Sequence, residues 1–84
     1  MIKAKRIEFY SNDGCKPCEV ALQQLRPIAD SFGVPVQIIK EGPAGEVIPK
    51  TCIVRDGENG KETKRCIQGW DENYATDLLD YLKH

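Results

Sequence analysis

The sequence predicts a small α/β domain whose elements follow in the order β-α-β-loop-β-β-α. Three observations predict this order. Apolar residues alternate with polar ones over residues 6–10, they recur at helical spacing over 17–32, and an Asn-Gly pair at 59–60 separates two further strand patterns. The chain has 84 residues, the size of one domain, and we expect residues 1–84 to form a single one.

The first predicted strand covers residues 6–10. Ile7 and Phe9 share one of its faces, which we expect to enter the core. Arg6, Glu8 and Tyr10 share the other face, which tolerates water. The turn residues 11–14 follow and lead to a pair of cysteines.

A helix is predicted from Pro17 to about Phe32. Its apolar stripe consists of Ala21, Leu25, Ile28 and Phe32, widened by Val20, Leu22 and Ala29. Pro27 should kink or break this helix because its ring blocks the turn before it and it has no N–H to donate. Gly33 should end it.

The remaining elements follow with short connections. Residues 34–39 form a second strand with Pro35 at its start or on an edge, and a right-handed crossover makes it parallel to the first. Residues 41–46 are a predicted loop, and strands follow over 51–55 and 62–67. Asp71 should cap a final helix. That helix has an apolar stripe of Tyr74, Ala75, Leu78, Leu79 and Leu82.

Cys52 and Cys66 lie on the two consecutive strands of the predicted hairpin. They face each other if the residue numbers of each pair across the hairpin sum to 118, as 52 and 66 do. This register requires a turn with an odd number of residues. A two-residue turn at Asn59-Gly60 would instead place them on opposite faces. We favour two small apolar side chains in the sheet over a second redox pair, and the sequence leaves open whether they form a disulfide.

Composition excludes several classes of partner. The formal net charge is −1 and Lys and Arg are not clustered, so nucleic acid is not an expected partner. No apolar run approaches membrane-spanning length, and the N-terminal residues 1–6 do not have the pattern of a secretory signal. We expect a cytoplasmic monomer that does not contact the membrane.

The chemistry of the chain centres on Cys15-Lys16-Pro17-Cys18. A thiolate at the start of a helix meets unpaired N–H groups and the positive end of the helix dipole, so Cys15 should lose its proton below the free-thiol pKa of about 8.5. Lys16 adds a positive charge, and Pro17 suits the first helical turn. Cys18, one turn further on, is placed to attack a mixed disulfide on Cys15. We therefore predict a thiol–disulfide exchanger.

Other roles for the cysteines remain open. Cys15 and Cys18 can form a structural disulfide or remain two buried thiols. All four cysteines can form a zinc site, although Cys52 and Cys66 lack the tight spacing of a zinc-ligand pair and His84 is the only histidine. An iron–sulfur cluster shared between two chains also remains open.

The chain resembles the thioredoxin-like fold, and more closely a glutaredoxin. The resemblance rests on Phe9-Tyr10-Ser11 followed by Gly14-Cys15-Lys16-Pro17-Cys18, on Ile48-Pro49 before a strand, on Gly69-Trp70-Asp71-Glu72 and on the order of elements. It implies a four-stranded mixed sheet with helices on one face. The usual helix between the second and third strands is missing or reduced here, because only about nine residues separate them.

The resemblance also implies roles for residues outside the cysteine motif. Ile48-Pro49 would be a cis bond next to Cys15, with the Ile48 backbone pairing with a substrate peptide. Lys16 and Lys50 would meet the carboxylates of glutathione, and Asp71 with Glu72 its ammonium group. Gly69 and Trp70 would form a wall of the site. For Glu8, a proton relay like that of thioredoxins is an alternative, and we favour a solvated residue.

The predicted function is that of a dithiol thiol–disulfide oxidoreductase acting on protein or glutathione mixed disulfides. Cys15 is the nucleophile and Cys18 the resolving thiol. No cofactor is expected to be bound, and glutathione can serve as the reductant. Two alternatives stay open: a thioredoxin-like protein reduced by a flavin-dependent reductase, and a non-catalytic metal-binding or interaction module.

Overall fold

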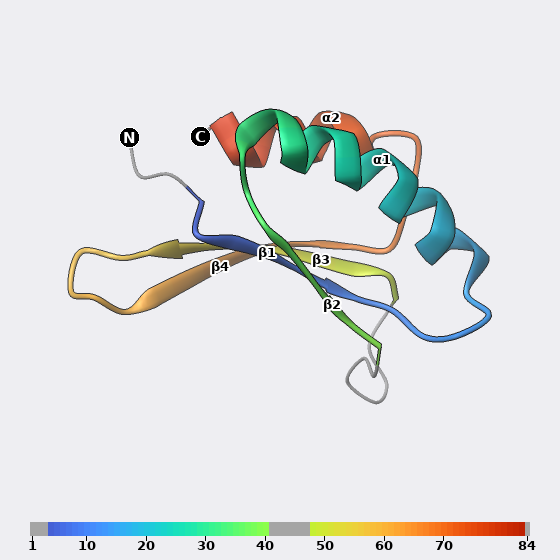
Figure 1. The fold of residues 1–84 in the computed structure, drawn as a ribbon, viewed down its shortest axis with the longest axis horizontal. Helices are drawn as coiled ribbons and strands as arrows, with labels where there is room; N and C mark the ends of the chain where they lie inside the picture. Colours follow the sequence, from blue (N-terminus) through green and yellow to red (C-terminus); the bar gives the residue numbers. More distant parts are fainter. Residues whose placement is uncertain (1–3, 41–47, 84) are drawn as a thin grey trace.

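The computed structural model describes residues 4–40 and 48–83. The described elements occur in the predicted order, with bounds that differ by a few residues. They are β1 (Arg6–Tyr10), α1 (Lys16–Phe32), β2 (Val36–Ile39), β3 (Lys50–Asp56), β4 (Glu62–Gln68) and α2 (Tyr74–Lys83) (Figure 1). The predicted loop at 41–46 lies outside the described residues, as do Val47, His84 and residues 1–3.

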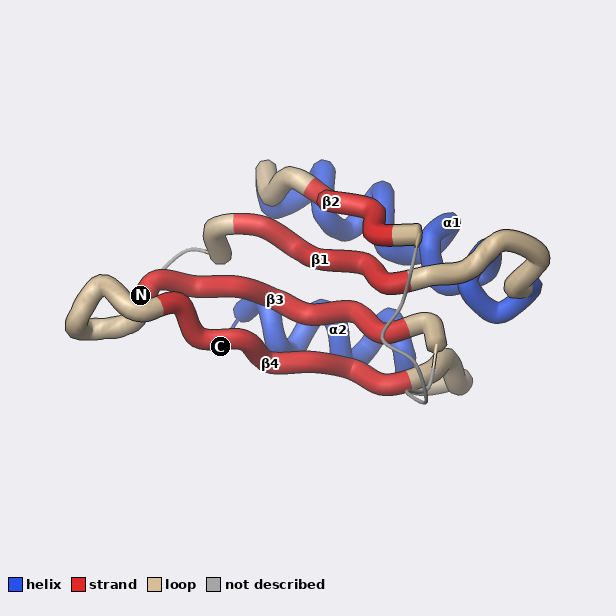
Figure 2. Tube along the Cα trace, turned by 90° about the horizontal axis from the view of Figure 1, so that it is seen from below, coloured by secondary structure: helices blue, strands red, loops and turns tan. Residues whose placement is uncertain are grey.

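The strands form one mixed sheet in the order β2-β1-β3-β4. β1 is parallel to β2 and antiparallel to β3, and β3 is antiparallel to β4. Both helices lie on one face of this sheet, so the view onto the other face shows the strands in front of the helices (Figures 1 and 2). The predicted α/β class, the four-stranded mixed sheet and the placement of the helices are thus confirmed.

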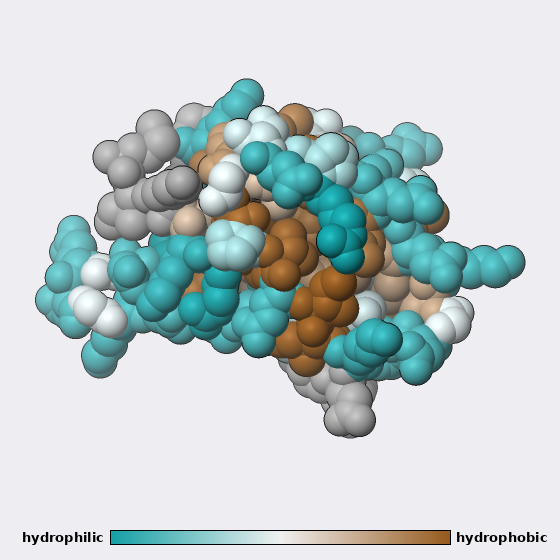
Figure 3. Space-filling model, in the orientation of Figure 1, coloured by the Kyte–Doolittle hydropathy of each residue, from teal (hydrophilic) through white to brown (hydrophobic). Residues whose placement is uncertain are grey.

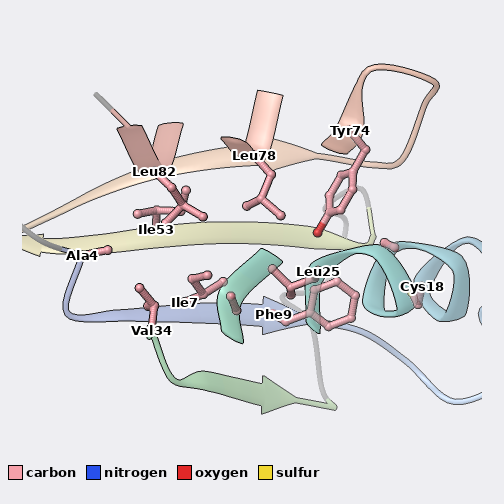
Figure 4. Packing of buried hydrophobic residues seen from close by; sticks show 12 residues of the cluster. Ala4, Ile7, Phe9, Cys18, Leu25, Val34, Ile53, Tyr74, Leu78 and Leu82 are labelled. Atoms are coloured by element: carbon pink, nitrogen blue, oxygen red, sulfur yellow. The ribbon is translucent and has the colours of Figure 1, made fainter. Parts of the chain in front are cut away.

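The core lies between the sheet and the two helices. Ile7 and Phe9 of β1 are buried there, as predicted from the alternation in that strand, and Ile53 of β3 lies beside them. Leu25 of α1 and Leu78 of α2 complete the cluster on the side of the helices (Figure 4). Because the core has only one sheet face, the other face must be stabilised in a different way.

α1 runs unbroken through Pro27, so the predicted break there is wrong. Pro27 is exposed, whereas Leu25 and Ala29 on either side of it are buried against the sheet. The packing of this buried stripe keeps the helix continuous at the cost of one backbone hydrogen bond. Gly33 ends the helix, as predicted, in the left-handed conformation with φ of 67°.

The turn before α2 agrees with the predicted cap, whereas one detail of the helix departs from the prediction. The Asp71 side chain accepts the Asn73 N–H at 2.8 Å, and the Asp71 carbonyl accepts the Tyr74 N–H at 3.1 Å. Asp71 thus binds N–H groups at the start of the helix, as predicted. Leu79 is 36% exposed and not part of the buried stripe, because the helix contacts the sheet along the narrower row of Tyr74, Leu78 and Leu82.

The β3–β4 hairpin adopts the register in which Cys52 faces Cys66. Residues 57–61 connect the strands, so the turn has the odd length that this register requires. The Gly57 N–H donates to the Lys61 carbonyl, and Gly60 has φ of 74°. The alternative with a tight Asn59-Gly60 turn is not adopted.

The helix-free face of the sheet carries a layer of charged side chains. Arg6 of β1 pairs with Glu8 at 3.1 Å and with Glu62 of β4 at 2.7 Å. Lys64 of β4 also pairs with Glu8, at 2.9 Å. Val54 lies between its partners Arg6 and Lys64 in the sheet and is fully buried. The aliphatic stems of these charged residues thus cover apolar surface that no helix covers among the described residues.

Apolar side chains also gather at the middle of the molecule in the view of Figure 3, on the side of the edge strand β2. Ile38 of β2 is 38% exposed. Among the described residues, no helix is long and apolar enough to cross a membrane.

Candidate functional site

Cys15 and Cys18 form a disulfide at the N-terminus of α1, with their Cα atoms 5.2 Å apart. Cys15 is the N-cap residue, and its Sγ accepts the Cys18 backbone N–H at 3.2 Å. Cys15 is partly exposed, whereas Cys18 is buried in the core at 4% exposure. The two sulfurs therefore differ in access: an approaching molecule meets Cys15 first.

The turn between β1 and α1 positions Cys15. The Ser11 N–H donates to the Ile39 carbonyl at 2.9 Å, which ties the start of the turn to the end of β2. Gly14 has φ of 78°, a conformation that residues with a Cβ rarely adopt. The Cys15 N–H donates back to the Asn12 carbonyl at 3.4 Å. Local hydrogen bonds thus close the turn and present Cys15 at the helix start.

A hollow of about 160 Å³ lies beside the disulfide. The polar residues that line it were predicted only as turn and helix residues, without a role in the site. The lining residues besides the two cysteines are Phe9, Ser11, Asn12, Asp13, Gly14, Glu19 and Leu22. Their position directly before and after the cysteine motif is the signal that would have identified them.

Ile48-Pro49 is a cis peptide bond, as the resemblance implied. Lys50 pairs with Tyr10, so the start of β3 lies at the end of β1 from which the chain continues to Cys15. The Pro49 carbonyl accepts the Gly69 N–H at 2.6 Å. Pro49 is fully buried and Ile48 is partly exposed. The three segments that the resemblance joins thus meet at one end of the sheet.

The other residues predicted to bind substrate lie around this end. Lys16 is exposed at the first position of α1. Lys50 places its Nζ 5.8 Å from the centre of the Tyr10 ring. Trp70 is 37% exposed, and its indole N–H donates to the side chain of Gln24 in α1 at 3.2 Å. None of these residues lines the hollow beside Cys15.

Glu8 is buried, at 6% exposure, so the expectation of a solvated residue is wrong. It sits on the helix-free face, where Arg6 and Lys64 pair with it and the Tyr10 hydroxyl donates to it at 3.1 Å. The hydrogen bond from Lys64 is the main cause that lowers the pKa of Glu8. The sheet separates Glu8 from the core that holds Cys18, a position unsuited to a proton relay for that pair.

Cys52 and Cys66 form a second disulfide, with Cα atoms 4.0 Å apart. The expectation of two plain apolar residues is therefore wrong. Pairing with Glu8 places Cys52 on the helix-free face, opposite the face that packs on Cys18. Cys52 is 1% exposed and Cys66 is partly exposed. Since the two disulfides lie on different sides of the sheet, the four sulfurs do not form one zinc-ligand set.

Within residues 4–40 and 48–83, no group of three or more His, Cys, Asp or Glu side chains is arranged to hold a metal ion. Compared with protein-family models and with curated protein sequences, the chain matches neither.

Proposed function

We propose that the protein is a dithiol thiol–disulfide oxidoreductase with a thioredoxin-like fold, closest in character to a glutaredoxin. One observation carries the proposal: a partly exposed cysteine caps a helix and is joined to a buried cysteine one turn further on. A structural disulfide does not need this difference in access, whereas an exchange reaction uses it.

In the reduced protein, Cys15 is the sulfur that acts as nucleophile. The Cys18 N–H and the positive end of α1 both stabilise a thiolate at this position, and Lys16 adds a positive charge nearby. The thiolate attacks one sulfur of a substrate disulfide. A bond forms between Cys15 Sγ and that sulfur, and the other substrate sulfur leaves with the electron pair.

Cys18 resolves the mixed disulfide. Its thiol loses a proton and attacks Cys15 Sγ, so that the substrate leaves as a thiolate and the Cys15–Cys18 disulfide forms. Two electrons have then passed from the protein to the substrate. Two molecules of glutathione, or a flavin-dependent reductase, return them, and glutathione is the donor that we favour. The proposed setting is the cytoplasm.

Substrate is proposed to bind where the chain segments meet at the end of the sheet. By resemblance, the Ile48 backbone next to Pro49 holds the substrate peptide as a short strand. Lys16, Lys50 and Asp71 bind the charged ends of glutathione, and Gly69 and Trp70 bound the site. The hollow lined by Ser11, Asn12 and Asp13 lies beside Cys15 and offers polar groups to the leaving half of the substrate.

Exchange with glutathione mixed disulfides and with insulin tests the proposal. Cys15→Ser should abolish turnover, and Cys18→Ser should accumulate a mixed disulfide on Cys15, visible as an added mass. Normal turnover by the Cys15→Ser protein would refute the proposal. Thiol counting after treatment of the oxidised protein with glutathione, or with thioredoxin reductase and NADPH, separates the two electron donors.

A further inference from the structure

The Cys52–Cys66 disulfide has no part in the reaction proposed for Cys15. It lies on the other face of the sheet, so neither of its sulfurs can reach the first pair through the strands. Its two cysteines differ in exposure in the same way as those of the first pair: Cys52 is 1% exposed and Cys66 is partly exposed. An attacking group therefore has a route to one sulfur only.

The neighbours of each sulfur explain this difference. Cys52 lies on an inner strand between Glu8 of β1 and Cys66 of β4. Glu8 is held over this region by Arg6 and Lys64. Cys66 lies on β4, which is at the edge of the sheet, so its outer side has no neighbouring strand among the described residues. The buried sulfur is thus fixed by the sheet, and the partly exposed one faces the solvent at the edge.

The covering layer also limits the size of an attacking molecule. Lys64 and Gln68 stand two residues to either side of Cys66 on the same face of β4, and both are exposed. A small molecule can pass between these two side chains, whereas a folded protein would have to displace the ion pair that Lys64 makes with Glu8. This surface suits a low-molecular-weight thiol such as glutathione.

We propose that the Cys52–Cys66 pair is a second thiol–disulfide exchange site, specific for low-molecular-weight thiols, with Cys66 Sγ as the atom attacked and Cys52 as the leaving sulfur. The thiolate of the small molecule forms a bond to Cys66 Sγ. The Cys52–Cys66 bond breaks, its electron pair stays on Cys52, and Cys52 takes a proton from water. Cys66 then carries the small molecule as a mixed disulfide.

A second small thiol completes the cycle. Its thiolate attacks the sulfur of the small molecule bound to Cys66, and the two small molecules leave as their own disulfide. Cys66 takes a proton. Two small thiols have then been oxidised to one disulfide, and the protein disulfide has been reduced to two thiols. The reverse sequence, started by an oxidised small disulfide, restores the pair.

Tryptic digestion can separate this reaction from the chemistry at Cys15. Trypsin does not cut the Lys16-Pro17 and Arg26-Pro27 bonds, so Cys15 and Cys18 remain together in the peptide Ile7–Lys40. Cys52 is released in Thr51–Arg55, and Cys66 in Cys66–Lys83. The oxidised protein is mixed with reduced glutathione, and the reaction is stopped with acid after increasing times. The free thiols are then alkylated, the protein is digested, and the masses of the peptides are measured by mass spectrometry.

We expect glutathione on the Cys66–Lys83 peptide and the alkylating group on Thr51–Arg55. Glutathione on Thr51–Arg55 would overturn the assignment of the attacked sulfur. If Thr51–Arg55 and Cys66–Lys83 stay joined while Ile7–Lys40 reacts, the pair is a structural staple and the proposal fails. A Cys52–Cys66 pair that does not react would leave the function proposed for Cys15 intact. Conversely, an absence of reaction in Ile7–Lys40 alone would leave the proposal for Cys66 intact.

Two single variants form a matched test that does not depend on the disulfide. Cys52→Ser leaves Cys66 as a thiol, and Cys66→Ser leaves Cys52. In oxidised glutathione, Cys66 should be modified roughly tenfold faster than Cys52 or more, because only a reachable thiolate attacks. Circular dichroism checks that both variants fold. Equal rates in two folded variants would contradict the proposal.

Discussion

Glu8 and Cys52 face each other across β1 and β3, on the side of the sheet away from both helices. This pairing places a buried carboxylate next to the second disulfide and separates it from the first. It also explains why a residue in the strand before the cysteine motif is buried without serving that motif. The ion pairs of Glu8 with Arg6 and Lys64 belong to the layer that covers the sheet.

The first prediction follows from this placement of Glu8. Glu8→Gln should leave the rate of exchange at Cys15 unchanged, and it should lower the free energy of unfolding by about 1–2 kcal/mol, because Arg6 and Lys64 lose their shared charged acceptor. Urea unfolding measures the second effect, and turnover of a glutathione mixed disulfide measures the first. A large loss of turnover at unchanged stability would restore the relay hypothesis.

The second prediction concerns the stability of the folded protein at low pH. Arg6 and Lys5 hold the pKa of Glu62 at about 2, below its ordinary value of 4.5. The ionised carboxylate therefore stabilises the folded state above pH 4.5, and this stabilisation is lost as the pH falls toward 2. The pKa of Glu8 is lowered as well, so its contribution is lost in the same direction. Urea midpoints measured over this range should fall with pH.

Glu62→Gln is the matched variant for this prediction. This variant should be less stable than the natural protein near neutral pH. It should also lose less stability between pH 4.5 and 2, since one of the carboxyl groups with a lowered pKa is absent. Added salt should reduce the difference between the two proteins at neutral pH, because Glu62 is partly exposed. An unchanged slope with pH would show that Glu62 does not contribute.

The third prediction concerns the hydrogen bond between Thr51 of β3 and Tyr74 of α2. Their hydroxyls lie 2.6 Å apart and both residues are fully buried. Tyr74→Phe leaves the Thr51 hydroxyl buried without this partner, which should cost about 1–3 kcal/mol. Adding Thr51→Val should recover part of that loss, since the unpaired hydroxyl is then removed. Thermal unfolding of the two variants measures both effects.

Tyr74 also limits the stability of the folded protein at high pH. Burial raises the pKa of Tyr74 to about 12 from 10.0. The neutral phenol therefore stabilises the folded state below pH 10, and this contribution is lost as the pH rises from 10 toward 12. The free energy of unfolding of the Tyr74→Phe protein should fall less steeply with pH over this range than that of the natural protein. Parallel alkaline unfolding curves would contradict the assignment of the raised pKa.

The fourth prediction compares the two disulfides as constraints on the unfolded chain. Cys52–Cys66 spans 14 residues and Cys15–Cys18 spans 3. Loss of the longer loop in Cys52→Ala/Cys66→Ala should cost about 3 kcal/mol, and loss of the shorter one in Cys15→Ala/Cys18→Ala about half as much. Urea unfolding of the oxidised proteins measures both. Equal losses would point to effects in the folded state.

Local pattern was sufficient to predict much of this protein. Alternation identified the two faces of β1, Gly33 marked the end of α1, and the spacing of Cys15 and Cys18 placed them on one helical turn. These features depend on residues a few positions apart, whose geometry follows directly from backbone dihedrals. The resemblance supplied the cis bond at Pro49, which composition alone would not have suggested.

Other features were decided only when distant segments packed together. The continuity of α1 through Pro27 depends on the sheet beneath Leu25 and Ala29. The burial of Glu8 depends on Lys64, which lies far along the chain, and the residues that line the hollow beside Cys15 come together only in the folded turn.

The sequence by itself determined the order of the elements and the place of Cys15 at a helix start, because both follow from short-range periodicity and capping. Only the tertiary structure decided that Cys52 meets Cys66 and that their disulfide lies on the opposite face from the first. A shift of one residue in the hairpin register would have separated them, and the odd-length connection over residues 57–61 excludes that shift.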